Sequence, residues 1–148
     1  MKSIILALSL LLSLPALANW DVNINDATVY SMTGPDSTGW SGGMSMQLDG
    51  LFTIAAFPPN WVKGDSTTTA RGKATIRVNG QAVKFDVIGH ADGSIYLHAK
   101  TYKGQAYIKG EFWNKARVLF INEDGSRVIQ SAKGFQQAWV DMTSGQGI

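Results

Sequence analysis

The sequence predicts a mainly β protein: a single antiparallel β-sandwich or barrel of about seven to nine strands with a short C-terminal helix. Apolar and polar residues alternate with a period of two over most of the chain after residue 18, which is typical of strands with one buried face. Turns that contain glycine separate these short runs. Helical spacing of apolar residues is found only in the segment after Ser131.

The first half of the domain contains four expected strands. These are Trp20 to Asn25, Thr28 to Met32, Met44 to Leu48, and Leu51 to Phe57. Asp49-Gly50 joins the last two as a hairpin turn pair. Pro58-Pro59 ends the fourth strand, because proline cannot donate a hydrogen bond to a ladder. Two long polar loops, residues 33–43 and 60–72, complete this half.

The segment from Lys73 to Lys100 gives the clearest register. Asn79-Gly80 favours a two-residue type I′ turn, since that turn needs positive φ at both central positions. A three-residue turn at residues 91–93 then keeps the apolar residues of the next strand on the same inner face. This register places Lys73 opposite Asp86, and Asp86 opposite His98, on the outer face. The expected inner residues are Phe85, Val87, Ile95, Leu97 and Ala99.

Three further strands are expected after Gly104. These are Ala106 to Trp113, Lys115 to Ile121, and Arg127 to Ser131. Val118 to Ile121 is apolar on both faces, which favours a central strand. The apolar spacing then changes to i, i+3, i+4 and i+7, one stripe of a short helix that Ser131 can cap. The residues of this stripe are Phe135, Ala138, Trp139 and Met142.

The first 18 residues have the three parts of a cleaved secretory signal peptide. Lys2 supplies the positive charge, Ile4 to Leu14 form the apolar part, and Ala16-Leu17-Ala18 has the small-x-small pattern of a cleavage site. The apolar run is shorter than the roughly 20 residues of a membrane-spanning helix. We therefore expect a periplasmic or secreted protein that begins at Asn19 and has no membrane span after cleavage.

Charge and cysteine content exclude several classes of function. Cleavage removes Lys2, so residues 19–148, the single expected domain, carry 12 basic residues (13 − 1) against 11 acidic ones, a net charge of +1. These charges form no basic stripe, so no nucleic-acid partner is expected. The chain has no cysteine, which excludes disulfides, thiol catalysis and thiolate metal sites. We expect no cofactor and no metal.

The candidate catalytic motifs are weak. Gly39-Trp40-Ser41-Gly42-Gly43 matches G-x-S-x-G, but a strand-like segment follows it where a nucleophile elbow needs a helix. His90 and His98 are the two histidines, and the predicted register brings no third metal ligand near them. We expect His98 and Asp86 to belong to an outer-face polar cluster. The protein is therefore expected to be no enzyme, and a small hydrolase is the least favoured alternative.

The tryptophans divide into two groups. Trp20, Trp113 and Trp139 lie in periodic segments and are expected in the core. Two others stand in polar loops, where an exposed ring either binds a partner or covers the end of the sandwich. A non-enzymatic binding protein is the first hypothesis, and a small periplasmic inhibitor that inserts a loop into an enzyme is the second. The candidate binding residues are Trp40, Pro59, Asn60 and Trp61.

The C-terminal segment from Gln130 to Ala138 carries the pattern S-x-x-G-F-x-x-A. This pattern resembles the ending of the invasion-associated locus B family of small exported bacterial proteins. The Trp20-Asp21-Val22 opening and the β-rich middle are similar too, whereas the cysteines usual in that family are missing here. The resemblance implies a periplasmic or secreted β-protein linked to host interaction or envelope stress, without known catalysis. Its partner would be a protein or an envelope component.

Overall fold

The computed structural model describes residues 19–145, so the expected signal peptide lies outside the described residues. Within that part of the chain, nine antiparallel strands form one sheet in the order β1-β2-β3-β4-β7-β6-β5-β8-β9. The strands are β1 (Asp21–Asn23), β2 (Thr28–Thr33), β3 (Ser41–Gln47), β4 (Phe52–Phe57), β5 (Thr68–Val78), β6 (Gln81–His90), β7 (Ile95–Ala99), β8 (Arg117–Ile121) and β9 (Arg127–Ser131). The helices are α2 (Tyr102–Asn114) and α3 (Phe135–Gly145).

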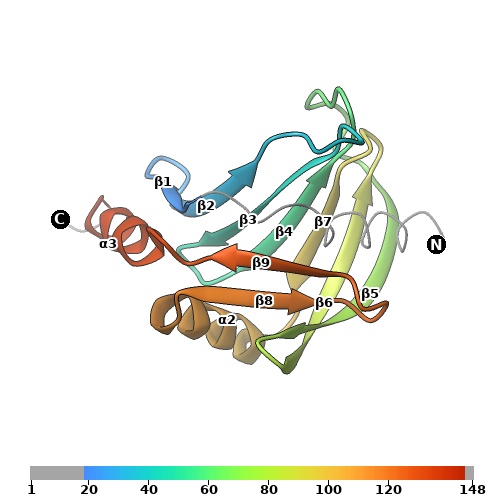
Figure 1. Cartoon of the computed structure of the whole chain (residues 1–148). Helices are drawn as coiled ribbons and strands as arrows, with labels where there is room; N and C mark the ends of the chain where they lie inside the picture. The colour runs from blue at the N-terminus through green and yellow to red at the C-terminus, as the bar shows by residue number, and fades with distance from the viewer. Residues whose placement is uncertain (1–18, 146–148) are drawn as a thin grey trace.

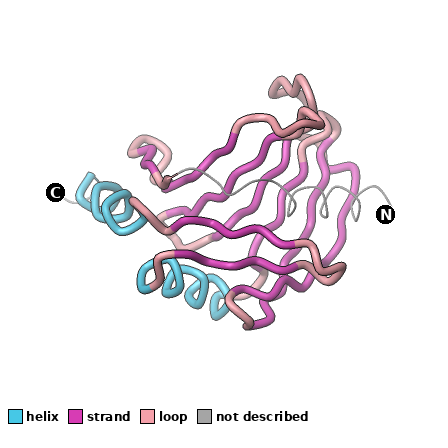
Figure 2. Tube along the Cα trace, in the orientation of Figure 1, coloured by secondary structure: helices cyan, strands magenta, loops and turns pink. Residues whose placement is uncertain are grey.

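The sheet is strongly curved, and β8 and β9 lie across its core-facing side (Figures 1 and 2). The ring of Phe52 in β4 stacks at 5.8 Å on the ring of Phe120 in β8, although the two strands are far apart in the sheet order. The apolar core fills the space between these layers and the two helices. β1 and β9 form the two outer strands, so the sheet is not closed. The predicted mainly β fold is confirmed as a sandwich-like or open-barrel sheet.

The two central hairpins have the predicted register. Val78 pairs with Gln81 around the Asn79-Gly80 turn, and both turn residues have positive φ. Lys73 pairs with Asp86, and Asp86 pairs with His98 on its other side. All five expected inner residues of β6 and β7 are buried. Turn chemistry and alternation therefore suffice to fix this part of the sheet.

The prediction of a strand from Ala106 to Trp113 is wrong, because this segment belongs to helix α2. The Thr101 side chain accepts a hydrogen bond from Gly104 N at 3.0 Å and caps the helix. Gly104 lets the helix approach the sheet, since a Cβ there would lie 3.0 Å from Val83 Cγ1. The helix buries Ile108 and Phe112, four residues apart on one side. Trp113 is 37% exposed and is not a core residue.

Two other details differ from the expectation at the C-terminal end. β8 is the second strand from the sheet edge, and only Val118 and Phe120 of its apolar residues are buried. Leu119 and Ile121, on its other face, remain partly exposed. Ser131 ends β9 and accepts a hydrogen bond from Lys133 N at 3.1 Å, so it does not cap α3.

Trp20 and the segment from Ser131 to Phe135 meet at one junction. Trp20 donates from its backbone N to Lys133 O at 3.0 Å and from its indole Nε1 to Ser131 O at 2.9 Å. Its ring lies edge-on to Phe135 at 5.0 Å. Gly134 has φ +85°, and a Cβ there would lie 2.8 Å from Trp20 O. The segment from Ser131 to Phe135 therefore joins the N-terminal end of the described chain to α3, and its role here is structural.

Candidate functional site: an aromatic row on the outer face

Five ring side chains lie in contact on the face of the sheet that points away from the core. They come from β4, β6, β7 and the loop after β4, and they are Phe57, Trp61, His90, Tyr96 and His98. We call them the outer aromatic row. The ring centroids are 4.5 Å apart for Phe57 and Trp61, 6.1 Å for Phe57 and Tyr96, 4.9 Å for His90 and Tyr96, and 6.2 Å for Tyr96 and His98. Each ring is only partly exposed.

Strand alternation places the row outside. Ile54 and Ala56 in β4, and Ile95 and Leu97 in β7, are buried in the core. Phe57 and Tyr96 follow them in the alternation and therefore point to the opposite face. β4 pairs directly with β7, which brings the two strands' outward side chains side by side.

A hydrogen bond fixes one end of the row. His98 Nδ1 lies 2.8 Å from Thr53 Oγ1, and the two residues are paired across β4 and β7. Thr53 is 7% exposed although it lies on the outer face. Burial lowers the pKa of His98, while the charge of Asp86 acts to raise it and His90 acts to lower it. The expected outer-face position of His98 is confirmed, but the residue is more buried than an exposed polar cluster implies.

The loop that carries Trp61 is tied to the β6–β7 turn. Ala91 N donates to Thr67 O at 2.9 Å, and Asp92 N donates to Asp65 O at 3.1 Å. Asp65 and Asp92 also accept hydrogen bonds from the hydroxyls of the following Thr67 and Ser94. These bonds anchor the part of the loop that follows Trp61 to the β6–β7 turn, beside the other end of the row.

The Trp61 ring presents carbon atoms to the surface and keeps its N–H inside. Its Nε1 is buried, and no hydrogen-bond partner for it lies among the described residues. The hydrogen bond from Ser94 is the largest cause that lowers the pKa of Asp92; the Trp61 indole N–H, which is close to this carboxylate but outside hydrogen-bond distance, is the smallest. A partner that meets Trp61 therefore contacts the face or carbon edge of the ring.

The other candidate binding residues lie beside this loop. Trp40 is half-buried and packs against the core. Gly39 lies against Pro59, since a Cβ there would be 2.9 Å from Pro59 Cβ and Cγ. Asn60 is exposed and has φ +58°. The structure thus brings the two tryptophan loops together and gives Trp61 the outward position.

Sequence reasoning missed Phe57, Tyr96 and the two histidines as members of this site. The predicted register already placed Tyr96 and His98 on the outer face. The missing step was the pairing of β4 with β7, because the long loop and the β5–β6 hairpin separate these strands along the chain.

The catalytic and metal-binding hypotheses find no arrangement to support them in residues 19–145. Ser41 is the first residue of β3 and pairs with Phe57, so a strand follows it. No hydrogen bond in the described part of the chain links Ser41 to a histidine. No three His, Asp or Glu side chains there are grouped closely enough to hold a metal ion.

Comparison of the chain with protein-family models, with curated proteins and with solved structures finds no significant match. No helix among residues 19–145 is long and apolar enough to cross a membrane.

The lowered pKa of His98 predicts a loss of stability in mild acid. The imidazole stays neutral in the folded state below its ordinary pKa of 6.5, whereas the unfolded chain takes up a proton there. The stabilising contribution is therefore complete above pH 6.5 and is lost as the pH falls through the folded pKa. Urea unfolding at pH 7.5, 6.5 and 5.5 should show a falling midpoint, and the fall should be smaller in His98→Gln.

The carboxylates with lowered pKa values do not interfere with this measurement. Hydrogen bonds from Thr38, Thr67 and Ser94, respectively, are the main causes that lower the pKa of Asp36, Asp65 and Asp92 from 3.8. Their effect on stability therefore begins near pH 4 and lies below the window of His98. An equal fall in wild type and His98→Gln between pH 7.5 and 5.5 would contradict the assignment.

Proposed function

We propose that this protein is an exported, non-enzymatic binding protein of the bacterial envelope or the secreted fraction, and that the outer aromatic row is its contact surface. The observation that carries the proposal is the continuous row of five rings on a sheet face that the core does not use. Aromatic rings supply large contact areas at a low cost in conformational entropy, which suits them to recognition. The signal-like first 18 residues and the resemblance to the invasion-associated locus B family support export.

The hydrogen bonds at the two ends of the row also support a binding role. The Thr53–His98 hydrogen bond holds one end, and the bonds between the Trp61 loop and the β6–β7 turn hold the other. A surface that is fixed in advance loses little side-chain freedom when a partner binds. The partner would lie across β4 and β7 and meet the rings of Phe57, Trp61 and Tyr96.

Removal of two rings should abolish capture of the partner. We expect the immobilised protein to retain a component of the periplasmic or secreted fraction. The double change Trp61→Ala, Tyr96→Ala should lower the recovery of that component about tenfold or more, because the two rings are large contact residues. Quantitative mass spectrometry of the eluates measures the recovery. The matched control is Trp113→Ala, which removes an exposed tryptophan on α2, away from the row.

Trp113→Ala should leave recovery unchanged, and circular dichroism should show that all three proteins are folded. A component that the folded double variant retains as well as wild type does would contradict the proposal. So would a component that is lost only with Trp113→Ala.

An enzyme inhibitor remains the second candidate because of Val62. This residue follows Trp61 at the outer part of the same loop and is 80% exposed. A fixed loop with an apolar exposed residue suits insertion into an enzyme cleft. Capture of one hydrolase that is lost with Val62→Asp but retained with Tyr96→Ala would favour inhibition over binding through the row.

A further inference from the structure

β5 has an unpaired backbone edge over part of its length. β6 pairs with β5 along nearly the whole strand, but β8 on the other side pairs only with Arg77 and Val78. The two-residue turn makes Val78 and Gln81 a hydrogen-bonded pair, so the odd-numbered residues of β5 direct their N–H and C=O groups away from β6. Figure 1 shows this part of β5 at the margin of the sheet.

The Glu123 side chain marks the point where pairing with β8 stops. Glu123 Oε1 accepts a hydrogen bond from Thr75 N at 3.0 Å, in the place where a carbonyl of a longer β8 would accept it. Beyond this point, the N–H and C=O groups of Lys73 and Arg71 face the edge and have no hydrogen-bond partner among the described residues. An unpaired strand edge of this kind can template the addition of another strand.

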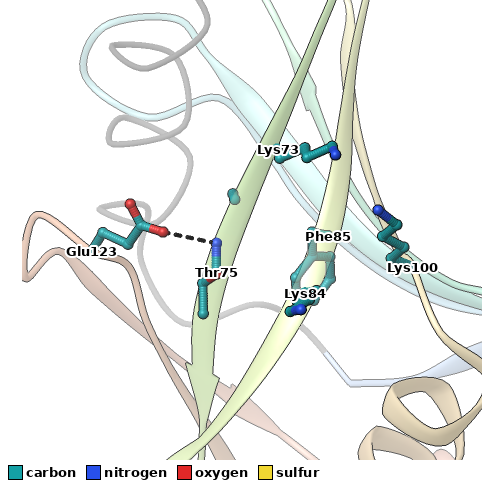
Figure 3. A pocket seen from close by; sticks show the side chains of 7 residues that line it. Lys73, Thr75, Lys84, Phe85, Lys100 and Glu123 are labelled. Carbon is teal, nitrogen blue, oxygen red and sulfur yellow. Dashed lines mark hydrogen bonds between the residues drawn. The ribbon is translucent and has the colours of Figure 1, made fainter.

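A basic cavity opens beside the free edge. It has a volume of about 240 Å³ and is lined by Lys73, Thr75, Lys84, Lys100 and Glu123, with Ala74 and Phe85 at its base. Figure 3 shows the amino groups of Lys73 and Lys100 pointing toward one another, while Glu123 meets the backbone of Thr75. No ion pair joins Lys73, Lys84 or Lys100 to a carboxylate in residues 19–145. Asp86, which pairs with Lys73 in register, is the acidic neighbour on this face.

We propose that the β5 edge at Arg71 and Lys73 binds an extended acidic segment of a partner protein as an added antiparallel strand. The backbone of that strand pairs with Arg71 and Lys73. Every second side chain of the added strand points to the outer face, where a carboxylate opposite Lys73 lies next to the basic cavity. The alternate side chains cover Gly72, which offers no side chain on the inner face. The site is separate from the outer aromatic row, so either can fail without the other.

The test uses the purified protein and a seven-residue peptide that alternates glutamate and valine. We expect saturable binding by calorimetry, no binding of the matching lysine–valine peptide, and shifts of the Arg71 and Lys73 amide signals in NMR spectra. Lys73→Ala removes one charge and keeps the backbone N–H, so it should weaken binding about threefold. Lys73→Pro removes that N–H as well and should weaken binding at least tenfold, because proline on a free edge disturbs no ladder of the folded protein.

A peptide N-methylated at the residues that face β5 provides the same test without any change in the protein, and it should not bind. Equal binding of the N-methylated and the unmodified peptide would overturn the proposal. Two results together would also overturn the proposal: polygalacturonate binds as tightly as the peptide, and Lys73→Pro binds the peptide no more weakly than Lys73→Ala does. They would show that the lysines bind polyanions in general, without strand pairing. Absence of peptide binding to the wild type would overturn it directly.

Discussion

Replacement of Phe112 by alanine should lower the free energy of unfolding by about 3–5 kcal/mol, the usual cost of truncating a buried aromatic residue. Phe112 is 1% exposed and lies at the centre of the aromatic core. Its ring contacts Trp20 at 4.9 Å and Phe135 at 5.4 Å, which join the N-terminal segment to α3. It also lies 6.1 Å from Phe52 in β4. A cavity at this position would loosen α2, α3 and the main sheet together.

Urea unfolding measured by circular dichroism tests this expectation. Trp113→Ala is the matched control, since its side chain follows Phe112 on the same helix but is 37% exposed. We expect that control to lose clearly less stability than Phe112→Ala, because part of the Trp113 ring is already in contact with water. The opposite result, a normal midpoint for Phe112→Ala and a large loss for Trp113→Ala, would contradict the placement of α2.

Trp139→Ala should lower the free energy of unfolding by about 3 kcal/mol, at the lower end of the range for a buried tryptophan. Trp139 is 9% exposed and stacks on Phe135 with ring centroids 6.1 Å apart. Lys109 Nζ of α2 lies 3.9 Å above its ring, so the change also removes a cation–π contact between the two helices. These contacts fix the docking of α3 against α2.

The control for Trp139 is its neighbour Val140, which is 46% exposed on the same helix. Val140→Ala should shift the urea midpoint very little. Trp139→Ala with a midpoint equal to that of wild type would show that α3 is not part of the core.

The central hairpins could be predicted because their determinants are local. Asn79-Gly80 selects a turn with positive φ at both positions, and this turn fixes the partner in β6 of each residue from Ala70 to Val78; the register shifts only beyond Ala70. The three-residue turn before β7 then follows from the requirement that Ile95 and Leu97 point inward. The C-terminal helix could also be predicted from local sequence, because its apolar residues have clear helical spacing.

α2 could not be recognised because its sequence signals conflict. Gly104 and Gly110 lower helix propensity, and the apolar residues Tyr107, Ile108, Phe112 and Trp113 do not form one stripe. What selects the helix is tertiary: Ile108 and Phe112 enter the core, and Tyr107 Oη donates to Val78 O of β5 at 2.9 Å. Alternation in the second half of the segment favoured a strand instead.

The candidate site was predicted only in part for a similar reason. Trp61 could be identified because it is a tryptophan in a polar loop. The other rings could be assigned to the site only from the pairing of β4 with β7. Trp40 has the same local signal as Trp61, yet it packs against the core. A local pattern therefore identified the loops, and long-range pairing decided which ring points outward.

The most direct test of the outer aromatic row is hydroxyl-radical footprinting of the protein with its captured component bound. Mass spectrometry of the oxidised peptides reports the reactivity of each ring. Protection of Phe57, Trp61 and Tyr96, with Trp113 as reactive as in the free protein, is the expected result. Unchanged oxidation of those three rings in the complex, together with protection elsewhere on the molecule, would contradict a binding role for the row.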